Sequence, residues 1–393
     1  MDFKNLKAFM DHLTDDLVPG NAISVYYENK EVYNYASGYA DIENKRPMSP
    51  DDMIFIYSCS KVATVVSAMQ LLERGRYLLS DPLYEYIPEF KDMYVKTGDG
   101  KIKKAENDIK IWNLLTMTAG FNYNQNKDAP HIIKANEITK GKMNTVDVIK
   151  CLAEQPLDFE PGERWQYSLC HDVLAAFVEV VSGKKFRDYV KENIFEPVGM
   201  NNSYYHLQPG MEEKMARQYI YRTVDPDKFD MVEAQSKGSS KKGYWENYGI
   251  KNDHVHSDEY DSGGAGIITT VSDYAKLANA LANNGTAQNG EKILSKGTID
   301  LMRTNQLSPE QKRYFSWSQL RGYGYGLGVR TLIDKSQASS VGSIGEFGWG
   351  GAAGATILVD PDRKFSFFYS HHMLNPHEDY YQPRLRNAAY SGI

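Results

Sequence analysis

Apolar residues recur at helical spacing in several separate stretches of the chain. Between residues 3 and 17 they fall three or four positions apart, and Pro19-Gly20-Asn21 then breaks the pattern. Asn144 and Thr270 are of the residue types that cap helix N-termini, and Thr270 with Asp273 has the pattern of a capping box. The spacing predicts helices over residues 3–17, from 58 to about 75, over 109–116, after 144, over 172–181, from 186 to about 194, and after 270.

Short runs with β-strand character lie near the two ends of the chain. They cover residues 22–27, 31–36, 325–333, 344–349, 355–359 and 364–370. Asp360-Pro361-Asp362-Arg363 has the composition of a hairpin turn. Residues 210–260 are polar and lack periodicity, so we expect long surface loops there that help to shape a substrate entrance.

The layout places strands at both ends and helices between them. It predicts one sheet that both termini close, with a helical region inserted. We therefore expect an α/β domain made of residues 1–57 and 262–393, and a mostly helical domain over residues 58–261.

Composition narrows the function classes. The 393 residues are 41% apolar and 24% charged, which excludes wholesale disorder. The net charge of −6 argues against a nucleic-acid partner, which would require clustered Lys and Arg. No run approaches roughly 18 apolar residues and the first residues form no signal segment, so we expect a cytoplasmic protein without a membrane span. One oddity is an excess of tyrosine, with 28 tyrosines against 15 phenylalanines.

The cysteines point to a reduced protein. Cys59, Cys151 and Cys170 lack the spacing of metal ligands, and an odd number cannot form a complete disulfide framework. We expect Cys59 to fill the core rather than to react.

A candidate nucleophile stands at the start of the second predicted helix. Ser58-Cys59-Ser60-Lys61 reads S-x-x-K, and the i, i+3 spacing places Ser58 and Lys61 on one helix face. A serine hydroxyl needs a neighbouring base, and a buried lysine near a helix N-terminus can serve as one. The backbone N–H of Ser58 could also face a developing oxyanion.

The chain around this motif resembles the serine β-lactamase-like superfamily, which includes class C β-lactamases, D-alanyl peptidases and family VIII carboxylesterases. The resemblance runs in order from about residue 20 to 375. The matching segments are Tyr57-Ser58-Cys59-Ser60-Lys61, Leu71-Leu72-Glu73-Arg74-Gly75, Ser80-Asp81-Pro82-Leu83, Leu114-Leu115-Thr116-Met117-Thr118-Ala119-Gly120, Phe159-Glu160-Pro161-Gly162, Tyr167-Ser168 and Ser262-Gly263-Gly264-Ala265-Gly266. The resemblance implies an antiparallel sheet flanked by helices, an inserted helical domain, and a site between the two.

The resemblance also implies a second proton-carrying group, Tyr167. Its phenolate, which the Lys61 ammonium would stabilise, or a proton shared between Tyr167 and Lys61, activates the serine and then the deacylating water. The family pattern is often Y-x-N, but Leu169 occupies the Asn position here. Since that Asn helps to hold an amide substrate, Leu169 disfavours β-lactamase activity.

A third implied element is Trp349-Gly350-Gly351, which stands where lactamases and peptidases generally carry Lys-Thr-Gly. This form resembles the W-G-G of some family VIII esterases. Trp349 would offer an apolar wall, and the two glycines would let substrate approach the strand. By resemblance, the N–H of Ala352 is the second oxyanion donor beside that of Ser58.

Several other motifs carry no expected function. Gly348 to Ala353 fits G-x-G-x-x-A but precedes a strand rather than a helix, so we expect no nucleotide site. The pairs His254/His256 and His371/His372 lack a matching carboxylate or cysteine spacing for a metal. We leave His171 out of catalysis and interpret the lysine pairs 103–104 and 241–242 as solvated loop charges.

Together these observations predict a serine hydrolase that forms an acyl-enzyme, most specifically a carboxylesterase acting on a small-molecule ester. Ser58, Lys61 and Tyr167 would be catalytic, and no cofactor or metal is expected. The alternatives are a β-lactamase or D-amino-acid peptidase, an acyltransferase with the same residues, and a non-catalytic sensor of acyl groups or peptidoglycan fragments. Acyl length, the natural alcohol and the oligomeric state stay open.

Overall fold

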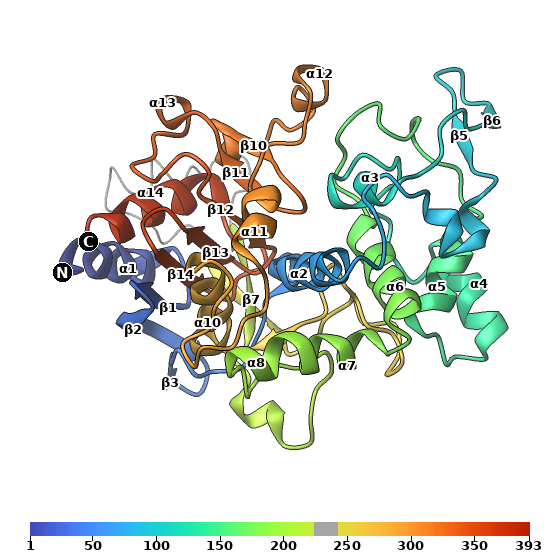
Figure 1. The fold of residues 1–393 in the computed structure, drawn as a ribbon. Coiled ribbons are helices and arrows are strands. Elements are labelled where there is room, and N and C mark those ends of the chain that lie inside the picture. The colour runs from blue at the N-terminus through green and yellow to red at the C-terminus, as the bar shows by residue number, and fades with distance from the viewer. Residues whose placement is uncertain (224–242) are drawn as a thin grey trace.

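The centre of the molecule is an eight-stranded antiparallel sheet (Figure 1). The computed structural model describes residues 1–223 and 243–393 of the chain. In spatial order, the strands are β10 (Tyr323–Tyr325), β11 (Arg330–Leu332), β12 (Phe347–Gly351), β13 (Ala355–Asp360), β14 (Phe365–Ser370), β1 (Gly20–Tyr27), β2 (Lys30–Asp41) and β3 (Arg46–Pro47). The expected antiparallel sheet built from both ends of the chain is confirmed.

The two ends of the chain meet inside this sheet. β1 pairs with β14 along its length, with Ala22 opposite Ser370. The backbone N–H of Asp2 donates to the carbonyl of Gly392 over 3.1 Å, and Figure 1 shows the two termini side by side. The sheet is therefore complete only when both ends of the chain are in place.

Two cores pack against opposite faces of the sheet. Successive strand residues point to opposite faces, so Ala22 and Tyr26 of β1 join the larger core while Ile23 and Val25 join the smaller one. The smaller core includes apolar residues of α1 (Lys4–Asp16) and α14 (Glu378–Tyr390). The larger core includes those of α10 (Val271–Ala282), which packs on β1, β13 and β14. Because β1 is buried on both faces, it lacks the polar alternation of a surface strand.

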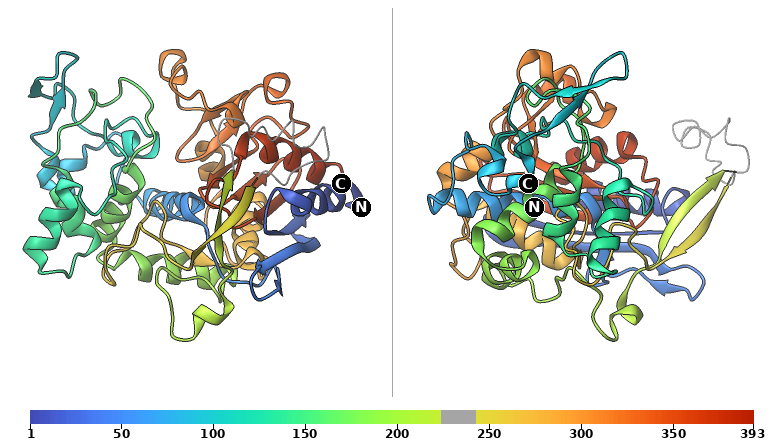
Figure 2. Two further views of the ribbon diagram at one scale, coloured as in Figure 1. Left: turned by 180° about the vertical axis from the view of Figure 1, so that it is seen from behind. Right: turned by 90° about the vertical axis from the view of Figure 1, so that its right-hand side faces the viewer.

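Helices from the middle of the chain form the part of the molecule that lies away from the termini (Figures 1 and 2). They are α2 (Ser60–Glu73), α3 (Ile111–Leu115), α4 (Pro130–Thr139), α5 (Thr145–Leu152), α6 (Cys170–Ser182), α7 (Phe186–Val190) and α8 (Glu196–Val198). α2 joins the two parts, because it packs on α6 and also contacts β12. The division into two domains at residues 57 and 262 stays a prediction.

The remaining elements are short. They are β4 (Ile54–Phe55) with β9 (Ile268–Thr269), β5 (Tyr94–Lys96) with β6 (Ile102–Lys104), β7 (Gln218–Thr223) with β8 (Gly243–Gly249), and α11 (Lys296–Met302), α12 (Pro309–Lys312) and α13 (Lys335–Ala338). No described helix is long and apolar enough to cross a membrane.

Local sequence signals located most helices correctly. The Asn144 side chain accepts a hydrogen bond from the Asp147 backbone N–H at 2.8 Å and caps α5. Thr270 accepts from the Asp273 N–H at 3.0 Å and caps α10. The Asp273 carboxylate accepts instead from the Asn202 N–H, at 2.6 Å, so it is drawn into a tertiary contact.

Two expectations about strands were wrong. Residues 325–333 are not one strand: a turn separates β10 from β11, and Gly328, with φ of +72°, lies in it. The segment 210–260 is not only loops, because β7 and β8 pair within it; its residues 224–242 lie outside the described structure. β7 was missed because its buried residues are polar or amphipathic: Gln218 and Tyr219 are fully buried, and the Tyr219 hydroxyl donates to Glu43 at 2.7 Å.

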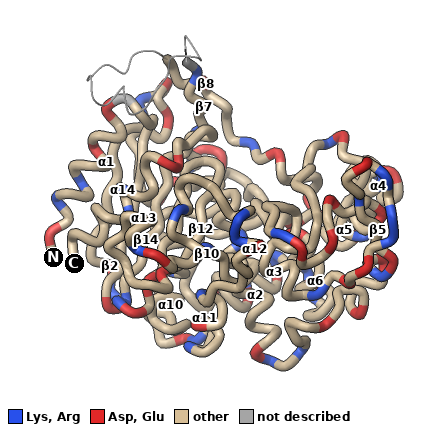
Figure 3. The backbone as a smooth tube through the Cα atoms, turned by 90° about the horizontal axis from the view of Figure 1, so that it is seen from above, with Lys and Arg blue, Asp and Glu red and all other residues tan. Residues whose placement is uncertain are grey.

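Charged residues of both signs are interspersed along the chain (Figure 3). Lys103 and Lys104 lie in β6 rather than in a loop, and both are exposed. Lys103 pairs with Glu106 at 2.6 Å and Lys104 with Asp92 at 2.7 Å. These two lysines are therefore solvated and locally neutralised. The other predicted pair, 241–242, lies outside the described residues.

Candidate active site

Ser58 is presented by a tight turn between β4 and α2. The 3-10 turn Tyr57–Cys59 precedes α2, and Tyr57 adopts a left-handed φ of 44°. That conformation is unusual for a bulky residue and costs about 1–3 kcal/mol, so surrounding contacts must hold it. The Tyr57 ring is buried, and its hydroxyl donates to Gln218 of β7 at 2.5 Å. The strained turn places Ser58, which is 9% exposed, at the start of the helix.

Lys61 and Tyr167 both reach the hydroxyl of Ser58. Lys61 Nζ donates to Ser58 Oγ at 3.2 Å, and the Tyr167 hydroxyl donates to the same oxygen at 2.5 Å. Lys61 is fully buried, and its Nζ lies 4.8 Å from the centroid of the Tyr167 ring. The three residues predicted from the S-x-x-K motif and the family resemblance thus converge on one oxygen atom.

The glycine turn after residue 261 anchors Lys61. The Gly264 carbonyl accepts a hydrogen bond from Lys61 Nζ at 2.8 Å. Asp172, near the start of α6, holds this turn: one of its carboxylate oxygens accepts from Ser262 Oγ at 2.7 Å and from the Gly264 N–H at 3.2 Å. The other carboxylate oxygen accepts from Gln125 Nε2 at 3.0 Å. Asp172 is therefore a buried acceptor that positions the carbonyl behind Lys61.

Tyr167 lies in the loop that enters α6. The Gln166 N–H donates to the Met117 carbonyl at 2.9 Å, and the Leu169 N–H donates to the Asn122 carbonyl at 3.1 Å. These bonds fix the backbone on both sides of Tyr167. The side chain of Leu169 is buried, so it packs in the core instead of lining the cavity.

Trp349 and its neighbours form an aromatic wall beside Tyr167. The rings of Trp349 and Tyr167 are stacked, with centroids 5.9 Å apart and planes inclined by 17°. Trp317 packs against both rings, with centroids 5.2 Å from Tyr167 and 6.0 Å from Trp349. Trp349 is 3% exposed and both packs in the core and lines the cavity.

The glycines after Trp349 bring β12 close to the nucleophile. A Cβ on Gly351 would lie 2.3 Å from the carbonyl oxygen of Ile56, so only glycine permits this backbone approach. Ala352 follows in the turn to β13 and lines the same cavity as Ser58. The expected oxyanion role of the Ser58 and Ala352 amides is compatible with this placement and stays a prediction.

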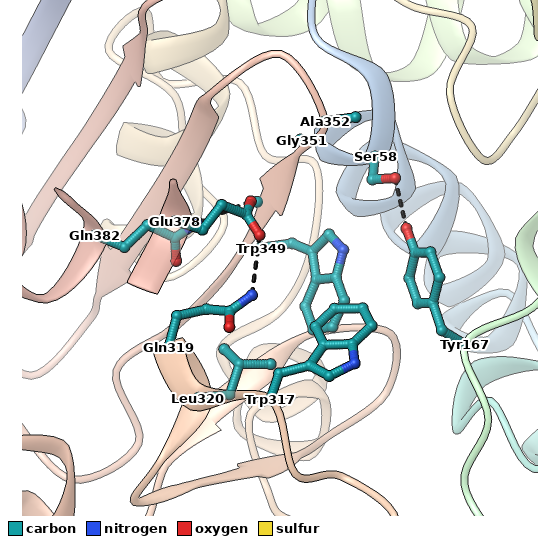
Figure 4. A pocket seen from close by; sticks show the side chains of 11 residues that line it. Ser58, Tyr167, Trp317, Gln319, Leu320, Trp349, Gly351, Ala352, Glu378 and Gln382 are labelled. Carbon is teal, nitrogen blue, oxygen red and sulfur yellow. Dashed lines mark hydrogen bonds between the residues drawn. The ribbon is translucent and has the colours of Figure 1, made fainter. Parts of the chain in front are cut away.

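These residues enclose a cavity of about 160 Å³ (Figure 4). Its lining consists of Ser58, Tyr167, Trp317, Gln319, Leu320, Trp349, Gly350, Gly351, Ala352, Glu378 and Gln382. Sequence reasoning identified the part contributed by Ser58, Tyr167 and residues 349–352. It missed Trp317, Gln319, Leu320, Glu378 and Gln382, because no motif marks them and only tertiary folding brings them to the cavity.

A second tyrosine beside the site was also missed. The Tyr123 ring lies 5.0 Å from the Tyr167 ring, and Lys61 Nζ lies 5.5 Å from the Tyr123 centroid. Burial, together with the neighbouring Tyr167 and Asp172, raises the pKa of Tyr123 well above its ordinary value. Tyr123 is thus held as a neutral phenol, whereas its loop position gave no signal in the sequence.

Most histidines of the described chain are buried or half-buried and neutral, and none belongs to the candidate catalytic residues. His171 lies in the first turn of α6, and burial lowers its pKa well below the ordinary value. Burial also lowers the pKa of His254 to about 4 and that of His371 to about 3. Within residues 1–223 and 243–393, no group of three or more His, Cys, Asp or Glu side chains is arranged to hold a metal.

The cysteines are free and buried. Cys59 is fully buried in the larger core, as predicted, and its Sγ faces the Trp349 carbonyl at 3.7 Å. Burial raises its pKa, so the thiol stays protonated.

Comparisons with known proteins place the whole chain in a family. The sequence profile of a family described as Beta-lactamase matches residues 4–390. Esterase EstB of Burkholderia gladioli is 27% identical over 377 residues, covering 92% of this chain and 88% of EstB. Lovastatin esterase of Penicillium rubens is 27% identical over 355 residues, covering 84% of this chain and 82% of that protein. The solved structure of EstCE1, described as a hydrolase with promiscuous acyltransferase activity, has the same fold, with a TM-score of 0.77, 24% identity and 98% of both chains covered.

Proposed function

Because the chain belongs to the Beta-lactamase family, and is thus a serine hydrolase acting on esters or amides, we propose that it is a carboxylesterase that forms an acyl-enzyme on Ser58. The observation that carries the proposal is the convergence of Lys61 Nζ and the Tyr167 hydroxyl on Ser58 Oγ, at the wall of a cavity. The names of the relatives EstB and lovastatin esterase support an ester substrate.

In the proposed acylation step, Ser58 Oγ forms a bond to the ester carbonyl carbon. For this step Tyr167 acts in its ionised form beside the Lys61 ammonium, so the hydrogen bond that its phenol donates to Ser58 in the structure reverses, and the Ser58 proton passes to the phenolic oxygen. The backbone N–H groups of Ser58 and Ala352 hold the oxyanion. The carbon–oxygen bond to the alcohol then breaks, and Tyr167 returns the proton to the leaving alkoxide.

Deacylation repeats the same path with water. Tyr167 takes a proton from water, the resulting hydroxide attacks the acyl carbon, and the bond to Ser58 Oγ breaks with return of the proton. The Gly264 carbonyl keeps Lys61 Nζ in place through both steps, because its hydrogen bond does not involve the reacting atoms. Apart from the ester and water, the proposed steps use only groups of the chain itself.

Two residues favour esters over lactams and peptides. Trp349 gives the cavity an apolar wall where a lysine would attract a substrate carboxylate. Leu169 is buried in the core and offers no amide to a substrate. We therefore propose ester hydrolysis as the main activity, with lactam cleavage at most a slow side reaction.

The test is a substrate panel. The purified protein is assayed with short and medium p-nitrophenyl esters, a chromogenic cephalosporin and a D-alanyl anilide. We expect ester turnover that falls by about 10³-fold or more in Ser58→Ala, with far slower cephalosporin turnover. Ser67→Ala is the matched control, because within the described residues the Ser67 hydroxyl bonds only to the Ala63 carbonyl of its own helix, at 2.9 Å.

Fast lactam hydrolysis with negligible esterase activity would show that the protein is a β-lactamase rather than a carboxylesterase. Ester turnover that survives in Ser58→Ala would overturn the mechanism. If added alcohols divert the product from free acid to a new ester, the enzyme is an acyltransferase that uses the same residues.

A further inference from the structure

A carboxyl group lines the candidate active-site cavity together with the aromatic wall. Glu378 is the first residue of α14 and lines the cavity with Ser58 and Trp349. One of its oxygens accepts from Gln319 Nε2 at 2.9 Å (Figure 4), and the other accepts from Gln382 Nε2 at 3.1 Å. Two amides from different elements therefore fix this carboxyl group.

The carboxyl group is the end of a hydrogen-bonded ladder along α14. Gln382 Oε1 accepts from Arg386 Nη1 at 3.4 Å, so Glu378, Gln382 and Arg386 are linked at i, i+4 and i+8. Arg386 Nη2 also donates to the Gln319 carbonyl, at 3.4 Å. Gln382 and Arg386 are each 2% exposed. Buried polar groups that are fully connected hold a fixed geometry, which distinguishes this acid from a mobile surface charge.

Gly350 makes room for this group at the cavity wall. A Cβ on Gly350 would lie 2.7 Å from Gln382 Nε2 and 2.8 Å from a carboxyl oxygen of Glu378. The two glycines of the Trp349-Gly350-Gly351 motif thus make room for two different neighbours. Gly351 admits the Ile56 carbonyl, and Gly350 admits the carboxyl and amide of α14.

An ionised carboxylate has about four acceptor positions, and the two glutamines occupy two of them. The remaining positions suit a hydrogen-bond donor and repel an anion. Resting on the proposed esterase function, we propose that Glu378 is a specificity-determining residue that selects esters carrying a hydroxyl or ammonium group and rejects esters carrying a carboxylate.

The environment of the carboxyl group supports this selection. The carboxyl group is ionised, as the selection requires, above pH 7, because burial raises its pKa to about 7 against the lowering effects of Gln319 and Arg386. The group has therefore already lost water in the free protein, so a substrate donor that contacts it incurs little further desolvation. A donor gains a contact that an apolar ester of the same length lacks.

The experiment compares four methyl esters of equal chain length: hexanoate, ω-hydroxyhexanoate, ω-aminohexanoate and the monoester of adipate. A parallel acetate series carries the same end groups on the alcohol. In at least one series, we expect the wild-type kcat/KM for a donor-bearing ester to exceed that for the carboxylate-bearing ester by about tenfold or more. Glu378→Gln removes the charge and keeps the size, and we expect it to abolish this preference mainly through KM, with each kcat/KM expressed relative to that of methyl hexanoate for the same variant.

Asp379→Asn is the matched control, since it removes the exposed neighbouring carboxylate on the same helix and should leave the preference unchanged. The hydroxyl and ammonium arms separate neutral donation from charge attraction. A preference that is equal in the wild type and Glu378→Gln, or a wild type that favours the carboxylate ester in both series, would overturn the proposal.

Binding separates this inference from the proposed function. In Ser58→Ala, calorimetric titration of the same esters measures affinity without turnover. If the wild type hydrolyses no ester but Ser58→Ala still prefers donor-bearing esters through Glu378, the function fails and the subsite stands. If esters are hydrolysed but neither Kd nor KM depends on Glu378, the subsite fails and the function stands.

Discussion

At the scale of single residues, the proposed acylation depends on the hydroxyl oxygen of Ser58 and its hydrogen bonds to Lys61 and Tyr167. Ser58 Oγ lies 3.2 Å from Lys61 Nζ and 2.5 Å from the Tyr167 hydroxyl. Among the tyrosines of the described residues, Tyr167 donates a hydrogen bond to Ser58 Oγ, and the order of the family segments rather than a local pattern selected it. The motif and the family segments pointed to residues that meet at Ser58 Oγ, whereas no motif marks Tyr123; the catalytic roles of Ser58, Lys61 and Tyr167 stay predictions.

Tyr167→Phe removes the proposed proton carrier and keeps the stacked ring. We expect kcat for ester hydrolysis to fall by about 10²- to 10⁴-fold, the usual contribution of a general acid–base group. Steady-state kinetics with a p-nitrophenyl ester measure the change. Tyr33→Phe is the control, because the described residues offer the Tyr33 hydroxyl no hydrogen-bond partner. Equal activity of Tyr167→Phe and the wild type would exclude Tyr167 from proton transfer.

Asp172→Asn changes an acceptor that holds the turn behind Lys61. An asparagine would turn an N–H₂ group toward donors that now bond to carboxylate oxygens, including Ser262 Oγ and Gln125 Nε2. We expect the free energy of unfolding to fall by about 1–3 kcal/mol, as measured by urea denaturation. We also expect kcat to fall more than KM changes, because Gly264 shifts relative to Lys61. Unchanged stability and unchanged kcat would contradict the positioning role.

At the scale of elements, short-range signals explain what could be predicted. α2, α5 and α10 carry apolar periodicity or caps in their own sequence, so their positions follow from local physics. α14 was not predicted, because it is polar on average and contains Pro383. Its buried face becomes evident only when Gln319 and Arg386 are brought together by the fold. The same reason hid Glu378 from sequence reasoning.

The two glycines of β12 predict different consequences of adding a methyl group. Gly351→Ala would clash with the Ile56 backbone, so β12 must move away from the Ser58 turn. We expect a large loss of kcat for every ester. Gly350→Ala meets side-chain ends that can shift, so we expect methyl hexanoate turnover to persist while the preference for donor-bearing esters weakens. A larger loss of kcat in Gly350→Ala than in Gly351→Ala would contradict this account of β12.

Glu378 also predicts a pH dependence of stability. Its pKa rises from 4.5 to about 7 on folding, with Arg386 and Asp379 as the charged neighbours and Tyr381 and Cys59 as titratable ones. Its protonated form favours the folded state, so its stabilising effect is complete below pH 4.5 and is lost as pH rises through about 7. As the pH is raised from 4.5 to about 7, we expect the Tm of the wild type to decrease relative to the Tm of Glu378→Gln. A pH-independent difference would show that the carboxyl group is not perturbed.

At the scale of the whole molecule, both ends of the chain build one sheet that carries the site. β14 pairs with β1, while β12 bears the aromatic wall and lies beside the Ser58 turn. Sequence layout predicted this closure because strand patterns stand at both ends. It did not predict β7, whose buried Gln218 and Tyr219 find hydrogen-bond partners across the fold, or β8, which is partly exposed and pairs with β7.

This closure predicts that the chain can be circularly permuted. Joining Ile393 to Met1 by a short linker and opening the exposed turn at Gly98–Gly100 keeps every sheet pairing, because the present termini are already adjacent. We expect a folded protein with ester kcat/KM within about twofold of the wild type. An insoluble or unfolded permutant, with the unpermuted chain folded under the same conditions, would contradict this description of the fold.

The central claim is that Ser58 is acylated by an ester. Intact-protein mass spectrometry after rapid quenching of a reaction with p-nitrophenyl butyrate, followed by peptide mapping, tests it most directly. We predict one butyryl group per chain, located on Ser58 and absent in Ser58→Ala, with the Ser67→Ala control acylated like the wild type. An acyl group on another residue, or ester turnover that persists in Ser58→Ala, would contradict it.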